Sequence, residues 1–360
     1  MVGWRKFLDA PAALVSRLIG RLAMPASAQE KARPIFIVST GRSGSTILTW
    51  CLGQHPNIIP QEESNWLGPF AIDAAVGHRR GTLRGERGQL SANFVSRDEL
   101  LESFGNAINA LILSHCTQFA DPSLRQRAGW HPPPFPITRA GDEPKRRWVD
   151  GTPEYSLYIC GLRKLFPEAR FVHIVRDVTD VVRSLLNFFP PGGRRLVESE
   201  QSAYEYWLRR ASACADAERA YGPQVVHRVR YCDLVAEPER TMRAVINFAG
   251  EAYAPECLEP LGERINSSNV PADFSEADVA TDRETVERAK KLSALLQETP
   301  QPAEASAEVA TRLEAEFDRQ VEYVTTLESK LNEARAAIAA LQTDRGAAAS
   351  TSDAPARATG

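Results

Sequence analysis

Residues 39–46 read Ser-Thr-Gly-Arg-Ser-Gly-Ser-Thr and combine the residue types that hold a phosphate-like anion. Hydroxyl groups and main-chain N–H groups of a glycine-containing loop donate hydrogen bonds to such an anion, and Arg42 adds a positive charge. A nucleotide-triphosphate loop needs Gly, four residues, then Gly-Lys-Ser/Thr. Counting from Gly41 places Thr46 and Ile47 where the second Gly and the Lys would stand. The motif therefore predicts an anion loop of a different kind.

The segments on either side of this loop are those that would position it. Residues 35–38 are four consecutive apolar residues, Ile-Phe-Ile-Val, which predict a buried parallel strand. Apolar residues at helical spacing follow the loop at positions 47, 48, 51 and 52, and Pro56 ends the predicted helix. In a strand–loop–helix unit the positive end of the helix dipole points at the ligand, together with the loop N–H groups.

Further polar groups are expected close to this loop. Two adjacent carboxylates, Glu62 and Glu63, come soon after the predicted helix, where the ordinary interpretation is solvated surface. Arg176 directly follows a second apolar run, residues 170–175. Because ligands of open α/β sheets bind at the carboxyl ends of the strands, we expect Arg176 at the same edge as the loop. His173, inside that run, is expected to be a hydrogen-bonded core histidine.

The run Gly-Arg-Ser-Gly-Ser-Thr after a strand resembles the 5′-phosphosulfate loop of sulfotransferases that use 3′-phosphoadenosine-5′-phosphosulfate (PAPS). The resemblance spans residues 34–270 and includes Thr152-Pro153 and Arg230-Tyr231 in the expected order. It implies a three-layer α/β domain like that of P-loop kinases, with a central parallel sheet. It also implies transfer of a sulfuryl group from PAPS, as co-substrate, to an acceptor hydroxyl without a metal.

The resemblance assigns roles to individual residues of this chain. Arg176 and Ser184, eight residues apart, would bind the 3′-phosphate, and Tyr231 would lie beside the adenine. Ser267 belongs to a stretch that would close over the sulfate. The 5′-phosphosulfate would be held by Gly41, Arg42, Ser43, Gly44, Ser45 and Thr46.

A Glu-Glu pair after His-Pro and a short strand is also part of the resemblance, and its second Glu acts as general base. Glu63 has that place, with Glu62 or His55 as the alternatives. The family often has Lys-Thr-Pro where this chain has Gly151-Thr152-Pro153, so the lysine that helps to hold the sulfate is missing. Arg42 is the first candidate to replace it.

A helix is expected to run from Pro153 to Phe166, with Thr152 or Asp150 as its cap.

The Arg-Lys-Gly-x-x-Gly-Asp-Trp-Lys block of cytosolic phenol and steroid sulfotransferases is absent from the sequence. That absence favours the bacterial, tyrosylprotein and carbohydrate branches, with a carbohydrate, a peptide or a bacterial metabolite as acceptor. The expected cytoplasmic location favours a glycan, glycolipid or small metabolite over a protein tyrosine. A net charge of −3 gives no general attraction to nucleic acid. The six cysteines show no Cys-x-x-Cys pair and no adjacent His cluster, which predicts reduced thiols, a cytoplasmic location and no zinc site.

The sequence divides into six segments. They are a basic amphipathic helix (1–24), a linker (25–33), the α/β domain (34–297) with a substrate-facing insertion (71–147), a second linker (298–306), a coiled coil (307–345) and a disordered tail (346–360). The first segment either lies on an anionic membrane as a peripheral contact or packs as an ordinary helix, and the residues leave both open.

Apolar residues recur in one heptad frame through the predicted coiled coil, over about five heptads. The seam positions are Ala310, Leu313, Phe317, Gln320, Val324, Leu327, Leu331, Ala334, Ile338 and Leu341. This pattern predicts a homo-oligomer, and the alternative is an Ala-rich solvated helix.

Two other functions remain open at this level. A kinase of the same fold is disfavoured by the missing Gly-Lys. A non-catalytic, membrane-associated coiled-coil assembly protein is suggested by the two terminal helices and disfavoured by Glu63, Arg176 and Ser184.

Overall fold

The computed structural model describes residues 33–115, 138–139, 144–189, 195–262 and 280–352. The predicted N-terminal helix at 1–24 lies outside these residues, as do most of the predicted linker at 25–33 and the end of the predicted tail. Among the described helices, none is long and apolar enough to cross a membrane.

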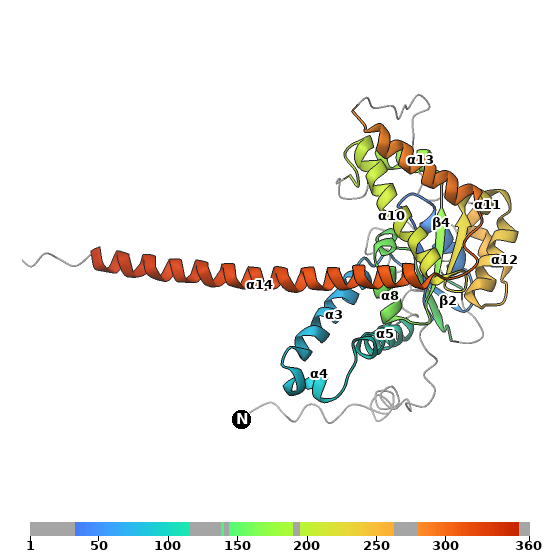
Figure 1. The fold of residues 1–360 in the computed structure, drawn as a ribbon. Coiled ribbons are helices and arrows are strands. Elements are labelled where there is room, and N and C mark those ends of the chain that lie inside the picture. Colours follow the sequence, from blue (N-terminus) through green and yellow to red (C-terminus); the bar gives the residue numbers. More distant parts are fainter. Residues whose placement is uncertain (1–32, 116–137, 140–143, 190–194, 263–279, 353–360) are drawn as a thin grey trace, which may run out of the picture. The chain divides into compact units, whose positions relative to one another are not determined.

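A five-stranded, all-parallel sheet forms the centre of the domain, as expected for an α/β fold (Figure 1). The strand order is β2-β3-β1-β4-β5. The strands are β1 (Ile35–Val38), β2 (Ile58–Gln61), β3 (Arg147–Asp150), β4 (Arg170–Val175) and β5 (Val226–Arg230). All four β1 side chains are fully buried, because helices cover both faces of the sheet. The prediction of a buried parallel strand at 35–38 is therefore confirmed.

One face of the sheet packs against a large helical layer. Phe36 points into this face, with its ring centroid 5.4 Å from those of Trp148 and Phe171. The helices of this layer are α3 (Leu67–Thr82), α5 (Arg97–Ser114), α8 (Ile159–Leu165), α10 (Glu200–Tyr221) and the first part of α14 (Ala307–Ser352). The short helices η1 (Gly85–Arg87) and α4 (Gln89–Ala92) connect α3 to α5.

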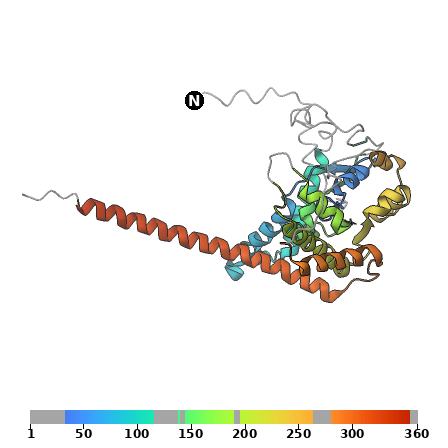
Figure 2. The same ribbon diagram turned by 90° about the horizontal axis from the view of Figure 1, so that it is seen from above.

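The opposite face receives Ile35 and Ile37 and carries the helix that follows the anion loop. The elements on this side are α2 (Ser45–Gly53), α11 (Tyr231–Ala236), α12 (Pro238–Ala249) and η3 (Pro255–Gly262). A third apolar cluster joins the end of β4 to α9 (Val178–Leu186), α10 and α13 (Arg283–Glu298). Figure 2 shows the same arrangement from above.

The helix predicted from Pro153 to Phe166 is not continuous. A 3₁₀ helix, η2 (Pro153–Leu157), comes first, and α8 begins only after Tyr158. Tyr158 packs directly on α3, where a Cβ on Gly68 would lie 2.6 Å from its ring. Tyr155 turns its hydroxyl toward the loop before α3 and accepts a hydrogen bond from the Leu67 N–H at 3.1 Å. These long-range contacts fix a tighter turn than the local pattern suggests.

The last helix, α14, begins as part of the domain. Phe317 and Val321 are each only 4% exposed and lie in the same core as α3 and α8. Lys164 of α8 pairs with Glu314 at 2.9 Å. The part of the predicted coiled-coil seam around Phe317 is therefore used inside the chain.

Candidate active site

The anion loop joins β1 to α2 through two residues in the left-handed backbone region. Arg42 and Gly44 have φ of +71° and +103°, and α2 begins directly afterwards at Ser45. A Cβ on Gly44 would lie 2.7 Å from the Tyr231 ring, so both the conformation and the space favour glycine. The Thr40 and Ser43 hydroxyls are 2.6 Å apart and hydrogen-bonded. The loop thus leads into the positive end of α2.

The residues predicted for the donor lie together at this edge of the sheet. Arg176, directly after β4, donates to the Arg42 carbonyl at 3.3 Å. Its guanidinium also lies 4.8 Å from the Tyr231 ring centroid. Ser184, on α9, accepts a hydrogen bond from Arg42 Nε at 3.2 Å. We call Arg42, Gly44, Arg176, Ser184 and Tyr231 the donor side of the site.

The Arg42 guanidinium is directed toward the residues predicted to bind the 3′-phosphate. Besides its bond to Ser184, it lies 4.1 Å from the Phe188 ring centroid. Burial, and then the positive charge of Arg176, lowers the pKa of Arg42, whereas the negative charge of Glu63 raises it. Arg42 therefore interacts electrostatically with both Arg176 and the candidate base, Glu63.

The loop that carries Glu63 is fixed by the residues around Thr152. The Ser64 N–H donates to Thr152 Oγ1 at 2.9 Å, and the Ser64 hydroxyl donates to Asp150 Oδ2 at 2.8 Å. The same hydroxyl is also hydrogen-bonded to the Tyr155 hydroxyl. Thr152 was predicted as a helix cap, but its side chain makes no capping hydrogen bond and holds the Glu63 loop instead.

Glu63 is a carboxylate whose pKa is raised toward neutrality by its surroundings. Desolvation is the largest cause that raises its pKa to about 7, followed by the negative charges of Glu154, Asp150 and Glu62, while Arg42 lowers it. The side chain is nevertheless exposed by surface area. Both statements hold for a carboxylate that keeps contact with water while surrounding protein displaces much of the bulk solvent. A pKa near neutrality suits a general base.

Asp150, at the end of β3, is a second carboxyl group with a raised pKa. It is only 1% exposed, and burial raises its pKa to about 6 in spite of three stabilising hydrogen bonds from Thr152 and Ser64. Those bonds occupy its oxygens, so Asp150 positions the Glu63 loop.

Gly151 has no room for a longer side chain. A Cβ at this position would lie 2.1 Å from Thr49 Oγ1, which itself donates to the Ser45 carbonyl at 2.9 Å. The lysine implied by the resemblance could not be placed here without displacing the Thr49 side chain of α2. The structure therefore gives a steric reason for the departure that the sequence shows at Gly151.

Sequence reasoning missed a cluster formed by Glu154, Tyr206 and Arg210. The Tyr206 hydroxyl is hydrogen-bonded to the Gly41 main chain and lies 3.4 Å from Glu154 Oε1, which also pairs with Arg210 at 3.3 Å. The Arg210 guanidinium lies 3.5 Å from the Tyr206 ring centroid and is 11% exposed. These contacts bring α10 to the anion loop, and no short-range pattern could have indicated them.

Two histidines considered from the sequence have structural roles. His55 Nδ1 accepts from the Asn57 N–H at 3.1 Å, so its Nε2 donates to the Ala252 carbonyl at 2.8 Å. With both nitrogens engaged and the ring buried, His55 does not suit the role of alternative base. His173 is buried and bonded to Glu218 at 2.6 Å, as expected of a core histidine. Ser267 lies outside the described residues.

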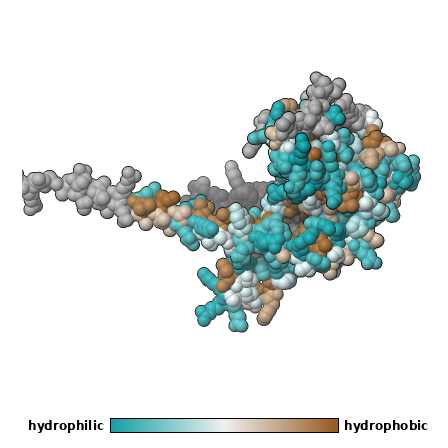
Figure 3. Space-filling view, turned by 45° about the horizontal axis from the view of Figure 1, so that its top comes forward, coloured by the Kyte–Doolittle hydropathy of each residue, from teal (hydrophilic) through white to brown (hydrophobic). Residues whose placement is uncertain are grey.

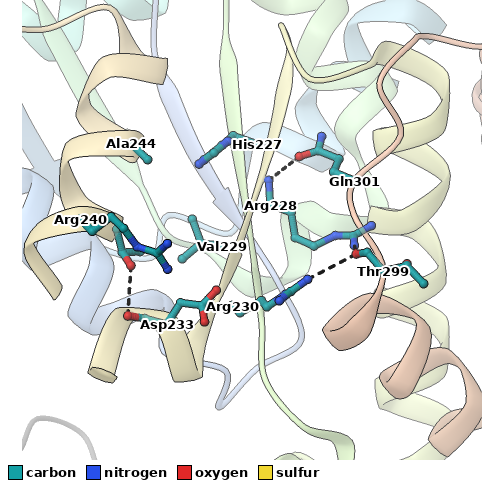
Figure 4. Close-up of a pocket in the computed structure, with 10 residues that line it drawn as sticks. His227, Arg228, Val229, Arg230, Asp233, Arg240, Ala244, Thr299 and Gln301 are labelled. Atoms are coloured by element: carbon teal, nitrogen blue, oxygen red, sulfur yellow. Dashed lines mark hydrogen bonds between the residues drawn. The ribbon is translucent and has the colours of Figure 1, made fainter. Parts of the chain in front are cut away.

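A cavity of about 310 Å³ lies along β5, at the edge of the sheet (Figure 4). No donor-side residue and no carboxylate of the Glu63 region lines it. Polar groups that line this cavity are hydrogen-bonded to one another. The Arg228 N–H donates to Gln301 Oε1 at 2.9 Å, and Thr241 Oγ1 donates to the Asp233 carbonyl at 3.0 Å. We therefore take the anion loop, rather than this cavity, as the candidate active site. Among the residues that the structure describes, no group of His, Cys, Asp and Glu could hold a metal ion.

Comparisons with known proteins identify the family to which the chain is similar. A sequence model of the sulfotransferase family matches residues 34–255. Among solved structures, the sulfotransferase domain of the Synechococcus PCC 7002 olefin synthase is 19% identical, with a TM-score of 0.39 and coverage of 80% of this chain and 96% of that chain. The sulfotransferase STF1 from Mycobacterium tuberculosis H37Rv is 16% identical, with a TM-score of 0.41 and coverage of 79% and 80%. No curated protein matches the sequence.

Proposed function

Because the chain belongs to the sulfotransferase family, we propose that it transfers a sulfuryl group from PAPS to an acceptor hydroxyl. One observation carries the proposal: Arg176 and Tyr231, far apart in sequence, meet the anion loop at Arg42 and Gly44. An anion loop alone would suit many phosphate ligands. A second arginine and a hydroxyl on α9 add a place for a further phosphate, as in 3′-phosphoadenosine compounds.

PAPS, when bound, supplies the activated sulfuryl group and a bisphosphate leaving group. In this proposal the loop N–H groups and the hydroxyls of Ser43, Ser45 and Thr46 hold the 5′-phosphosulfate. Arg176 and Ser184 hold the 3′-phosphate, and the Tyr231 ring lies beside the adenine. The Gly44 conformation and the nearby arginine fit such a doubly anionic ligand.

Glu63 removes the acceptor proton in this mechanism. The bond from the acceptor oxygen to sulfur forms as the bond from sulfur to the phosphate oxygen breaks, and the proton moves to the Glu63 carboxylate. Positioning and charge stabilisation supply most of the catalysis in a loose transfer of this type, by analogy with phosphoryl transfer. Glu62 is the alternative base, and it is exposed beside Glu63.

Two arginines can offset the charge that develops during transfer. Arg42 belongs to the loop itself. Arg210 reaches the loop from α10 through Tyr206 and Glu154, and its guanidinium is mostly buried. This arrangement supports Arg210 as a second cation at a site where Gly151 excludes the lysine of related enzymes.

A glycan, or the sugar of a glycolipid, is the acceptor that the surroundings of Glu63 support best. Trp66, three residues after Glu63, is 45% exposed and continues through Phe70 to Phe104, with ring centroids 5.7 and 5.6 Å apart. Exposed aromatic faces next to carboxylates suit a sugar ring, which has apolar faces and a hydroxyl-bearing edge. The five described cysteines are unpaired, which supports a reducing compartment such as the cytoplasm.

The test is sulfuryl transfer from PAPS to a panel of glycans and small hydroxyl compounds, with ATP and Mg²⁺ as the competing donor. Glu63→Gln provides the control for enzyme-dependent transfer. Transfer from PAPS that the variant loses supports the proposal. Phosphoryl transfer from ATP would contradict it and identify a kinase.

A further inference from the structure

The far part of α14 carries an apolar stripe that the domain does not cover. As far as Thr325, partly buried side chains of α14 recur among exposed ones, and Phe317 and Val321 are buried in the core. Every side chain described between residues 326 and 342 is exposed. Figures 1 and 2 show this part of the helix extending past the other elements of the domain.

The exposed part continues the same seam in the same heptad frame. We call Leu327, Leu331, Ala334, Ile338 and Leu341 the distal seam. Its four large members are 46%, 50%, 55% and 68% exposed, in chain order. Figure 3 shows hydrophobic surface along this extended helix. Large apolar side chains aligned on one face of a helix are costly to leave in water.

In proteins, most of the stability of a helix comes from the packing of its apolar face rather than from its own hydrogen bonds. The domain holds α14 through Phe317, Val321 and Val324, and Arg79 pairs with Glu322 at 2.8 Å. A partner that covers the distal seam would supply such packing to the part of the helix beyond the domain.

We infer that the distal seam pairs with the same seam of a second copy of this chain. The composition favours two strands at most positions: Val324 and Ile338 are β-branched residues at two of the three a positions, where Leu331 is the third. Leu327 and Leu341 occupy two of the three d positions, and Ala334 occupies the other. β-Branched residues at a with leucine at d favour two-stranded coils. The distal seam continues the docked stripe, so pairing needs no rearrangement of the domain.

The pair is expected to be weak and concentration-dependent. Residues 327–341 span about 22 Å of helix, short of the standard size of a stable interface. Lys330 and Arg335, at g and e positions beside the seam, would face each other across a parallel pair and oppose it. Both features predict a pair whose population rises with protein concentration.

The test is the molar mass of the full chain by light scattering over a concentration series. The monomer has a mass of 39.7 kDa, and we expect the wild type to approach twice that value as its concentration rises. Leu331→Glu with Ile338→Glu places two charges in the seam and should keep the protein monomeric. Asn332→Glu with Ala336→Glu adds the same two charges to the same exposed helix outside the seam and should associate like the wild type.

Two results would overturn the inference. One is a wild type that stays monomeric at all concentrations, which would assign the seam to a different partner or to none. The other is a seam variant that associates as strongly as the wild type. Circular dichroism of both variants checks that the domain remains folded. The result is independent of sulfuryl transfer, because neither pair of substitutions touches the candidate active site.

Discussion

The two sides of the candidate site differ in the sign of their charge and in how their side chains are held. The donor side has two arginines that are held by hydrogen bonds. Arg42 donates to Ser184, and Arg176 donates to the Arg42 carbonyl. The side that would receive the acceptor is rich in carboxylates, and Glu63 there has a pKa of about 7. The anion loop lies between them.

This difference separates two properties of the proposed enzyme. Arginines keep their charge at all physiological pH values, so donor binding should change little with pH. Proton removal depends on a carboxylate that titrates near neutrality, so turnover should change strongly. Substitutions on one side should therefore leave the property of the other side nearly intact.

The largest effect is expected from Glu63→Gln. Loss of the general base should reduce turnover by about 10²–10⁴-fold, because the glutamine amide cannot accept the proton. Affinity for 3′,5′-adenosine bisphosphate should stay close to that of the wild type. Unchanged turnover would transfer the role to Glu62, which the same assay of Glu62→Gln would examine.

Arg176→Ala should act on the donor side alone. Loss of a charge-assisted contact to a phosphate costs about 1.5–3 kcal/mol, which corresponds to a rise of about 10–150-fold in the KM for PAPS. Turnover at saturating PAPS should fall much less. Arg243→Ala, on the exposed face of α12 where Arg243 pairs with Glu239, is the matched control. Equal KM values for the two variants would refute the role of Arg176.

Gly151→Ala should destabilise the junction between the two sides. The new methyl group would meet Thr49 Oγ1, and overpacking of this kind costs about 1–3 kcal/mol, measurable as a lower Tm. Thr49→Ala removes the obstructing hydroxyl. Gly151→Ala should therefore lower the Tm less in the Thr49→Ala background than in the wild type. A Gly151→Ala protein as stable as the wild type would contradict the steric account.

Glu154→Gln should have the smallest effect, a shift in the pH profile. Glu63 must be ionised to act, so turnover is expected to rise as the pH increases through about 7. Removing the negative charge of Glu154 lowers the pKa of Glu63 and moves this rise to lower pH. Glu316→Gln, on α14, removes a carboxylate that is not among the charges acting on Glu63 and should leave the profile in place. A rise displaced to higher pH would contradict the account.

The sequence predicted the parts of the site that depend on local order. The strand at 35–38, the anion loop and α2 are contiguous, and the spacing of Arg176 and Ser184 lies within one strand–helix unit. The cluster of Glu154, Tyr206 and Arg210 could not be predicted, because Glu154 and Tyr206 are 52 residues apart in the chain. The contact of Ser64 with Thr152 spans 88 residues and was hidden for the same reason.

The C-terminal helix shows a different limit of sequence reasoning. Apolar residues at i, i+3, i+4 and i+7 describe both a coiled-coil seam and the buried face of a helix docked on a domain. Phe317 fits both patterns, and only the structure shows that it contacts the core. The apolar pattern continues unchanged past residue 326, although the side chains beyond that point are exposed rather than packed on the domain.

The most direct test of the central claim is a calorimetric titration of the wild-type protein with 3′,5′-adenosine bisphosphate and, separately, with ADP. The two ligands differ mainly in where the second phosphate is attached. If Arg176 and Ser184 form a 3′-phosphate site beside the anion loop, the bisphosphate should bind much more tightly than ADP. Equal affinities, or no binding of the bisphosphate, would contradict the assignment of this edge of the sheet as a PAPS site.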